Sequence, residues 1–540
     1  MVRTARTGAD LIVEALLAAG VRHLFSLSGN QILPVYDATI GRPLSIIHTR
    51  HEAAAVHMAD AWGRLTEEPG VALVTAGPGH CNALSALYGA LMAESPVVLL
   101  SGHAPAGQAG RGAFQEMDQV GAARPVTKAA WLARDAERLG EDMAAALEIA
   151  RSGRPGPVHV SLPGDLLEAR VSAPSRGAGP RQPAASEDLA GPMGAALALL
   201  AQAKRPLILA GPAMARARRW AAVERLSALT GIPALPVESP RGINDPWLHA
   251  ATNSLGRVDV VLLAGKRLDF ALRFGEPPAF SRECRFIQID AEAPAAPGGR
   301  VEVAMCGDPA LGLDRMAALA QERTWTHRAW GEEVRAARKS VPGEWESLRR
   351  SSSTPMHPLR VCAGIQPLLD QGAVLVVDGG EFGQWAQAGL EAEIRLINGP
   401  AGSIGSAIPM ALGAKLAHPE RQIVAVLGDG TFGFHGFELD TALRAGLPLV
   451  AVVGNDARWN AEHQLQLQHY GAERTVGCDL RLSRYDQLAT ALGGHGEFVE
   501  DPVDLDAALS RAVKSRAPAC VNVVIDGVAA PTYRASGAAH

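Results

Sequence analysis

The sequence predicts an α/β protein of three doubly wound domains, each built on a parallel sheet, and three observations support that fold class. Short apolar runs of strand length alternate with helical patterns along most of the chain. This order is typical of parallel sheets with helices on both faces. Stretches rich in Pro, Gly and Ser interrupt the alternation, as linkers between domains do. A length of 540 residues suits about three domains of ordinary size.

The first domain is predicted to cover 1–172. Its strand patterns lie at 23–27, 45–49, 71–77, 95–102 and 156–163. Its helical patterns lie at 9–20, 51–65 and 80–94. The stretch "SAPSRGAGPRQPAASEDLAGP" follows, and its composition predicts a linker.

The middle domain is predicted at 186–340 and the third at 355–530, with a second linker at 351–358. The middle strand patterns lie at 205–211, 258–265 and 285–290. Those of the third domain lie at 373–380, 421–430, 448–456 and 519–526. The first and third domains are alike in length and rhythm, so we expect them to share a fold, and we expect the middle domain to be Rossmann-like.

Composition argues against several classes of function. The net charge is only −5, and no basic stripe or RNA-type aromatic cluster is present, so nucleic-acid binding is not expected. No apolar run reaches the roughly 20 residues that cross a bilayer. Six scattered cysteines without zinc spacing are typical of a reduced, cytoplasmic protein. Asp10 and Glu14 interrupt the first apolar run at helical spacing, which favours an amphipathic helix over a signal peptide.

Small polar residues follow two strand patterns of the third domain. Asp429 lies between two glycines after one strand, and Asn455 ends the next strand in the same way. Because the carboxyl ends of neighbouring parallel strands share one edge of a sheet, the two side chains should meet there. A carboxylate, an amide oxygen and a nearby carbonyl suit Mg²⁺, which takes its other ligands from phosphate and water. Either residue alone is better explained as a helix cap or a turn, but the pair is not.

The spacing of these two sites resembles the signature of thiamin diphosphate enzymes. Nearly the whole chain resembles the acetolactate synthase, benzaldehyde lyase and 2-hydroxyacyl-CoA lyase group of that family. The resemblance implies that Mg²⁺ is held by the side chains of Asp429 and Asn455 and by the carbonyl of Ala457. It implies diphosphate contacts from Gly428, Gly430 and Thr431. The usual Asn pair is Gly454-Asn455 here, and the resemblance places the ligand at the second residue.

The same resemblance assigns the activation of the cofactor to Glu52 in "RHEAAAVHMADAWGR". Glu52 would hydrogen-bond the aminopyrimidine ring, whose imino form then takes the C2 proton and leaves the reactive ylide. Ile404 would hold the two cofactor rings in a bent arrangement, and the Gly402 carbonyl would accept from the 4′-amino group. A Glu in a first helical turn also favours the helix dipole, which is the alternative explanation for Glu52.

Further cofactor contacts are implied in "VVDGGEFGQW", at Gly380, Glu381 and Phe382. In this family the pyrimidine-binding first domain of one subunit faces the diphosphate-binding third domain of another. The resemblance therefore implies a homodimer or homotetramer with active sites at the subunit interfaces.

Substrate contacts are harder to assign. The segment "GAFQEMDQV" resembles an active-site segment of the family, so Phe114 and Gln115 are candidates to touch the reacting carbonyl. Asn30 lies after the first strand, where some relatives carry catalytic histidines. Trp459 and His463 either line the substrate pocket or belong to a partly exposed helix.

The middle domain resembles that of oxalyl-CoA decarboxylases and 2-hydroxyacyl-CoA lyases, in which it binds ADP or the nucleotide end of CoA. Arg267 and Asp290, at strand ends, are the candidate phosphate and ribose contacts. No Gly-rich dinucleotide fingerprint is present, and Asp290 could be an ordinary turn residue. FAD, which acetolactate synthases bind in this domain, is not expected because the contact segment is not evident.

Three hypotheses about function follow. The first is a thiamin diphosphate- and Mg²⁺-dependent carboligase or lyase that acts on 2-oxo acids or 2-hydroxy carbonyl compounds. The second is a 2-hydroxyacyl-CoA lyase or oxalyl-CoA-type decarboxylase, with acyl-CoA as substrate. The third is a non-catalytic subunit that has kept the fold, which Glu52, Asp429 and Asn455 argue against.

Overall fold

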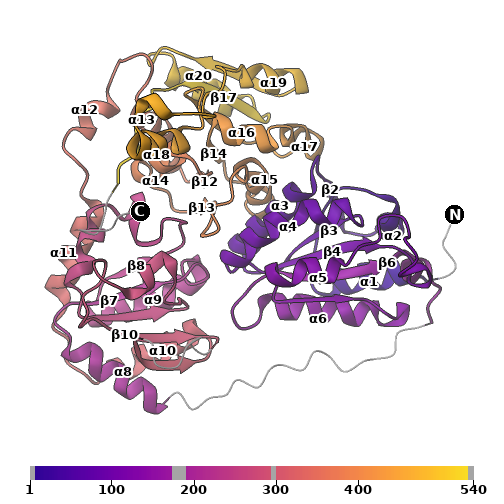
Figure 1. The fold of residues 1–540 in the computed structure, drawn as a ribbon, viewed down its shortest axis with the longest axis horizontal. Helices are drawn as coiled ribbons and strands as arrows, with labels where there is room; N and C mark the ends of the chain where they lie inside the picture. Colours follow the sequence, from indigo (N-terminus) through magenta and orange to yellow (C-terminus); the bar gives the residue numbers. More distant parts are fainter. Residues whose placement is uncertain (1–5, 173–189, 293–299, 533–540) are drawn as a thin grey trace.

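The computed structural model describes residues 6–172, 190–292 and 300–532 (Figure 1). Most of the linker predicted after the first domain, and the last residues of the chain, lie outside the described residues. Three separate sheets are present, and every pair of neighbouring strands in them is parallel. The predicted fold class is therefore confirmed.

The first sheet has six strands in the order β2-β1-β3-β4-β6-β5. Its strands are β1 (His23–Ser26), β2 (Ser45–His48), β3 (Gly70–Val74), β4 (Val97–His103), β5 (Ala129–Leu132) and β6 (Val158–Pro163). Its helices are α1 (Gly8–Ala18), α2 (Leu33–Ala38), α3 (Glu52–Thr66), α4 (Pro78–Met92), α5 (Gln119–Ala123), α6 (Leu139–Arg151) and α7 (Gly164–Glu168).

The third sheet repeats this arrangement, in the order β13-β12-β14-β15-β17-β16. Its strands are β12 (Val374–Val377), β13 (Arg395–Ile397), β14 (Ile423–Gly428), β15 (Val450–Asn455), β16 (His495–Val499) and β17 (Ala519–Val524). Its helices are α13 (Pro358–Asp370), α14 (Glu381–Gly389), α15 (Ala407–Ala417), α16 (Asp429–His435), α17 (Glu438–Ala445), α18 (Asn460–Tyr470), α19 (Tyr485–Leu492) and α20 (Leu505–Lys514). The expectation that the first and third domains share a fold is confirmed.

The middle sheet has five strands in the order β11-β10-β9-β7-β8, a doubly wound arrangement. Its strands are β7 (Pro206–Ala210), β8 (Ala234–Pro236), β9 (Val260–Ala264), β10 (Arg285–Asp290) and β11 (Val301–Cys306). Its helices and those that lead into the third domain are α8 (Ala190–Gln202), α9 (Ala217–Thr230), α10 (Pro309–Ala320), α11 (Arg328–Lys339) and α12 (Trp345–Arg349).

The strands that the sequence pattern did not predict are β5, β8, β11, β13 and β16. Each of them lies at an edge of its sheet. Interior strands such as β7 and β14 are buried on both faces and form continuous apolar runs. An edge strand is partly exposed, as the alternating burial of β11 shows, so its apolar pattern is weaker.

Strand order determines where each domain can bind a ligand. In both six-stranded sheets the order reverses between the first and third strands, at β1 and β3 and again at β12 and β14. Loops that leave the carboxyl ends of such strands diverge and open a crevice. The loops after these four strands are therefore the positions where a ligand site is expected.

The first and third domains pack against each other in the single chain (Figure 1). Helices α3 and α4 of the first domain share one apolar core with α15 of the third. At the rim of this contact, Arg64 donates a hydrogen bond to the carbonyl of Ile397 over 2.7 Å. The middle domain meets the first through Arg154, which pairs with Glu94 and Asp290.

Within the described part of the chain, every helix is too short or too polar to cross a membrane.

Candidate functional site

Two loops border the crevice of the third domain, and the buried carboxylate of Asp378 links them by hydrogen bonds. Asp378 follows β12 directly and is fully buried. Its side chain accepts hydrogen bonds from the backbone N–H groups of Gly379, Gly405 and Ala407 over 2.7, 3.0 and 2.9 Å. Burial raises the pKa of Asp378 to about 6. Asp378 thus fixes the loop at 378–380 against the loop at 402–407, both predicted to contact the cofactor.

Two acidic residues line the pocket at the end of β14. Asp429 begins α16 and is 1% exposed, and Asp456 follows β15. Both residues line the same pocket, together with Gly428, Gly430 and Thr431. Burial, followed by the charge of Asp456, raises the pKa of Asp429 to about 7, and burial raises the pKa of Asp456 to about 6. Asp456 follows the predicted ligand Asn455 in the sequence and was not itself expected to bind the metal.

Asn455 ends β15 but does not line this pocket. It is completely buried, and its Nδ2 donates to the Ser483 carbonyl at 3.0 Å and to Oδ1 of Asn522 at 3.1 Å. Its Oδ1 accepts from the Ala457 N–H at 3.3 Å. Successive side chains of a strand end point in opposite directions, and here Asp456 takes the direction that was expected of Asn455.

Ala457 was predicted to offer its carbonyl to the metal. In the structure this carbonyl accepts a hydrogen bond from the Leu480 N–H over 2.7 Å. Arg458, one residue further on, lines the pocket instead. Its backbone N–H contacts the carboxylates of both Asp429 and Asp456, and these bonds favour their charged forms.

The chemistry of this pocket suits a divalent cation that takes its remaining ligands from phosphate and water. Oδ2 of Asp429 is buried and has no hydrogen-bond partner among the described residues. Nowhere in the described ranges do three or more His, Cys, Asp or Glu side chains gather as a complete metal site. Mg²⁺ commonly takes one or two protein carboxylates and completes its shell with phosphate and water oxygens. The pair Asp429 and Asp456 matches that requirement.

Aromatic residues pack beside Gly430 at the edge of the pocket. The indole of Trp459 lies against Gly430, where a Cβ atom would come within 2.7 Å of the ring. Phe434 meets Trp459 edge to face at 6.2 Å between ring centroids. Thr431 donates from its hydroxyl to the Gly428 carbonyl at 3.0 Å. Gly430 is therefore required by the close approach of Trp459.

The remaining predicted cofactor residues of the third domain lie around the same crevice. Gly380, Glu381 and Phe382 line the pocket. Ile404 packs on Gly379, where a Cβ would lie 2.8 Å from its Cγ2. Gly402 has a φ of +67° in the same loop. Glu381 is nearly buried and accepts hydrogen bonds from Gln384 at 3.1 Å and from the Ala530 N–H, so it also anchors the end of the chain.

The first domain holds the other predicted residues around the loop that follows β3. Glu52 begins α3, is 7% exposed, and accepts a hydrogen bond from Nδ2 of Asn82 at 3.0 Å. A Cβ atom on Gly79, in the first turn of α4 and just past the loop that follows β3, would lie 3.2 Å from Oε1 of Glu52. The carboxylate is thus placed at the crevice between β1 and β3.

Gln115 reaches the same loop, and its neighbour Phe114 lines a pocket next to it in the first domain. Gln31, after β1, donates to Oε1 of Gln115 at 2.8 Å and accepts from the hydroxyl of Thr75. Gln115 has a φ of +59°, and its Cβ lies 3.0 Å from where a Cβ on Gly77 would be. Phe114 is 70% exposed in the single chain. Asn30, Gln31 and Phe114 line one pocket of the first domain.

The two crevices form separate pockets in one chain. The pocket with Asp429 is lined only by residues of the third domain, and the pocket with Phe114 only by residues of the first. Of the predicted cofactor contacts, Glu52 belongs to the first domain and the others to the third, and Glu52 lines neither pocket.

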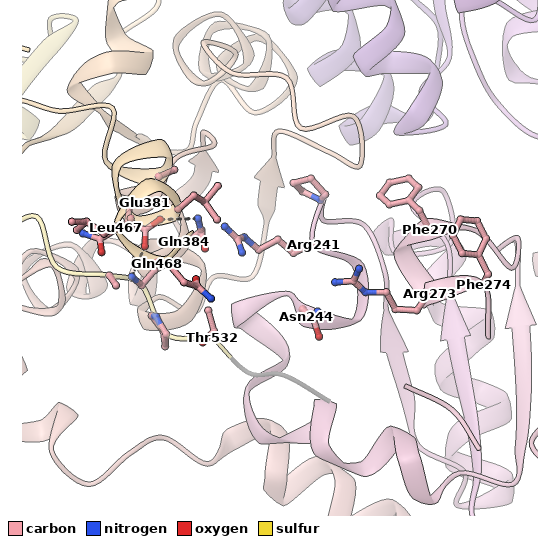
Figure 2. A pocket seen from close by; sticks show the side chains of 17 residues that line it. Arg241, Asn244, Phe270, Arg273, Phe274, Glu381, Gln384, Leu467, Gln468 and Thr532 are labelled. Atoms are coloured by element: carbon pink, nitrogen blue, oxygen red, sulfur yellow. Dashed lines mark hydrogen bonds between the residues drawn. The ribbon is translucent and has the colours of Figure 1, made fainter. Parts of the chain in front are cut away.

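A third and larger cavity of about 710 Å³ lies between the middle and third domains (Figure 2). Arg241, Phe270, Arg273 and Phe274 reach it from the middle domain, and Glu381, Gln384 and Gln468 from the third. The two phenylalanines are 42% and 62% exposed. Glu381 and Ala461 line both this cavity and the pocket with Asp429, so the two are adjacent. No local sequence pattern indicates this cavity, because its residues come from five separate segments of the chain.

The predicted nucleotide residues of the middle domain do not line this cavity. Asp290 is 1% exposed and pairs with Arg154 of the first domain. Arg267 is half exposed and pairs with Glu292. Trp459 lines the pocket with Asp429, whereas His463 lines neither that pocket nor the large cavity.

Comparisons with known proteins agree with this arrangement. Residues 6–122 match the "Thiamine pyrophosphate enzyme, N-terminal TPP binding domain", 193–316 the central domain and 378–523 the C-terminal TPP binding domain of the same family. A probable acetolactate synthase of Mycobacterium bovis is 37% identical over 96% of this chain and 95% of its own. Human 2-hydroxyacyl-CoA lyase 2 is 32% identical over 91% of this chain and 85% of its own. A 2-hydroxyacyl-CoA lyase of rice is 30% identical over 96% of this chain. The predicted resemblance is confirmed.

Proposed function

Because the chain belongs to the thiamine pyrophosphate enzyme family and is a thiamin diphosphate-dependent enzyme, we propose that it makes or breaks a carbon–carbon bond beside a carbonyl group. Its substrates are 2-oxo acids or 2-hydroxy carbonyl compounds, in the manner of the acetolactate synthases. One observation carries the proposal: Glu52 and the pair Asp429 and Asp456 lie at equivalent crevices of two matching domains.

The third domain binds Mg²⁺ and the diphosphate in this proposal. Asp429 and Asp456 supply two carboxylate oxygens, and the backbone carbonyl of Arg458 is the third candidate ligand. Asn455 supports them from behind by holding the start of the loop after β15. Two observations support this assignment: Oδ2 of Asp429 has no hydrogen-bond partner among the described residues, and Asp429, Asp456 and Arg458 line one pocket. In this proposal Asp456 and Arg458 take the places that the sequence predicted for Asn455 and Ala457.

The first domain binds the pyrimidine ring. When bound, thiamin diphosphate supplies a carbanion that attacks a carbonyl carbon and then accepts its negative charge. Glu52 accepts and returns the proton at the ring nitrogen, and its burial keeps bulk water from competing for that proton. Ile404 and the Gly402 carbonyl hold the rings in their bent arrangement.

Two chains complete one active site. Glu52, which is proposed to contact the pyrimidine, lies in the first domain, whereas the residues proposed to hold the metal and the diphosphate lie in a pocket of the third. A symmetric dimer that turns the first domain of one chain towards the third domain of its partner brings both halves together twice. The exposed Phe114 would be covered in that assembly.

A second candidate function, an acyl-CoA lyase or decarboxylase, is favoured by the large cavity. A volume of about 710 Å³ exceeds what a small 2-oxo acid fills. Arg241 and Arg273 could pair with phosphates, and Phe270 and Phe274 offer flat faces to a purine (Figure 2). Since this cavity adjoins the metal pocket through Glu381, a thioester chain could extend from it to the cofactor.

Product analysis by NMR with thiamin diphosphate and Mg²⁺ distinguishes the two functions. The substrates are pyruvate, glyoxylate, an acyloin and a 2-hydroxyacyl-CoA, and Glu52→Gln protein is the control. Condensed 2-hydroxy ketones from the oxo acids, with carbon dioxide released, support the first function. Aldehyde and formyl-CoA from the thioester, with the oxo acids unchanged, support the second. The absence of products that depend on Glu52 from all four substrates contradicts both.

A further inference from the structure

Glu52 and Asn82 reach the same corner of the first domain from two helices. Asn82 lies one turn into α4, and its Nδ2 donates to Oε2 of Glu52 at 3.0 Å. Glu52 is 7% exposed, whereas Asn82 is exposed in the single chain. An amide at the rim of the crevice therefore holds the buried carboxylate.

The two helices that carry this pair are packed closely. Small buried residues of α3, such as Ala55 and Ala59, share an apolar core with Ala83 and Ala86 of α4. Small side chains let the helix backbones approach, and close-packed cores resist displacement. The positions from which Glu52 and Asn82 extend are thus fixed relative to each other.

We propose that Asn82 is a positioning residue for Glu52, an inference that rests on the role proposed above for Glu52. An amide donates a hydrogen bond but neither titrates nor carries charge. It orients the carboxylate without neutralising it, whereas a Lys or Arg partner would compete for the charge that accepts the proton. The bond occupies Oε2, so Oε1, on the side of Gly79, is the oxygen left for the pyrimidine nitrogen.

Two variants of the complete enzyme separate orientation from packing. Asn82→Asp keeps the shape of the side chain but removes the donor, and Asn82→Ala removes both. Asn253→Asp is the matched charge control, because Asn253 is an exposed asparagine of the middle domain. The measurements are affinity for thiamin diphosphate with Mg²⁺ by calorimetry, the melting temperature without cofactor, and deuterium exchange of the cofactor C2 proton by quenched NMR.

Both Asn82 variants are expected to bind cofactor nearly as tightly as the wild type and to melt close to the Asn253→Asp protein. Their C2 exchange should slow by about 10- to 100-fold, the effect of losing a hydrogen bond to a charged group at a reacting centre. Wild-type exchange in both variants overturns the proposal. The proposal is also overturned if the slower C2 exchange is accompanied by equally large losses of cofactor affinity and melting temperature. That result would show that Asn82 acts through packing.

Glu52→Gln separates a failure of this inference from a failure of the proposed function. If that variant exchanges the C2 proton at the wild-type rate, the role of Glu52 is wrong, and the inference about Asn82 fails with it. If Glu52→Gln is blocked while both Asn82 variants exchange normally, only the inference about Asn82 fails.

Discussion

Asp429 and Asp456 place two carboxylates in one buried pocket, close enough for the charge of Asp456 to raise the pKa of Asp429. Oδ2 of Asp429 lacks a hydrogen-bond partner among the described residues. Without a cation, such a pair is electrostatically unfavourable. A divalent cation would remove the repulsion, and this makes the pair the centre of the proposed metal site.

Substitution of either carboxylate should weaken metal binding. Asp429→Asn and Asp456→Ala each remove one proposed ligand, and we expect the affinity for Mg²⁺ in the presence of thiamin diphosphate to fall by about 100-fold or more. Calorimetric titration measures this change. Asp314→Asn, which alters an exposed aspartate of α10, is the control. Unchanged affinity in Asp456→Ala, with a large loss in Asn455→Ala, would return the ligand role to Asn455.

Metal affinity should increase with pH in the weakly acidic range. The pKa values of about 7 for Asp429 and about 6 for Asp456 exceed the ordinary value of 3.8, so both groups hold protons in the metal-free fold at pH 5. Mg²⁺ must displace these protons, and its affinity should rise by about 10-fold per pH unit for each proton released, then level off above pH 7. Titrations between pH 5 and 8 test this, and a flat profile would contradict it.

In the metal-free protein, the contribution of Asp429 to folding stability should decrease as pH rises. A carboxyl whose pKa is raised in the folded state favours folding while it is protonated, and that contribution is lost as pH rises from about 4 to 7. Asp429→Asn should therefore increase the melting temperature of the cofactor-free protein more at pH 8 than at pH 5. An equal shift at both values would contradict the raised pKa.

Asp378 should contribute to stability although it does not line the pocket proposed to bind the metal. Asp378→Ala leaves the N–H groups of Gly379, Gly405 and Ala407 without their buried acceptor. We expect a loss of about 1–3 kcal/mol in stability and weaker cofactor binding, because both cofactor loops lose their common anchor. Denaturation with and without cofactor measures both effects. Normal stability together with normal cofactor affinity would mean that the loops do not depend on Asp378.

The arginines of the large cavity should distinguish CoA substrates from small acids. If the second function holds, replacing Arg241 and Arg273 together by Ala should reduce affinity for CoA by about 10-fold or more and leave pyruvate turnover unchanged. Arg225→Ala, on an exposed helix of the middle domain, is the matched control. CoA binding that is equal in all three proteins would exclude this cavity as its site.

The interior of the fold could be predicted from sequence, whereas its edges and side-chain directions could not. Runs such as "IVAVLG" and "VAVVGN" identify buried strands because both faces are apolar, but β16 is partly exposed and has no such run. Asp429 could be placed because a glycine on each side marks its turn. Whether Asn455 or Asp456 faces the pocket depends on the direction of each side chain at the end of β15. A shift of one residue along the strand reverses these directions, and the sequence does not determine it.

Contacts between segments that are distant in the chain could not be predicted from the sequence either. The hydrogen bond from Asn82 to Glu52 depends on how α4 packs on α3. The large cavity depends on how the middle domain meets α14 and α18. No local sequence pattern indicates either contact.

The central claim, that two chains share each active site through Glu52 and Asp429, is tested most directly by subunit complementation. Glu52→Gln and Asp429→Asn proteins, each inactive alone, are co-expressed with different tags, and the mixed dimer is purified and assayed. If the sites lie between chains, one of its two sites contains both wild-type residues, and about half of the wild-type activity per dimer returns. If the mixed dimer is as inactive as its parents, Glu52 and Asp429 serve the cofactor from the same chain, and the shared site is wrong.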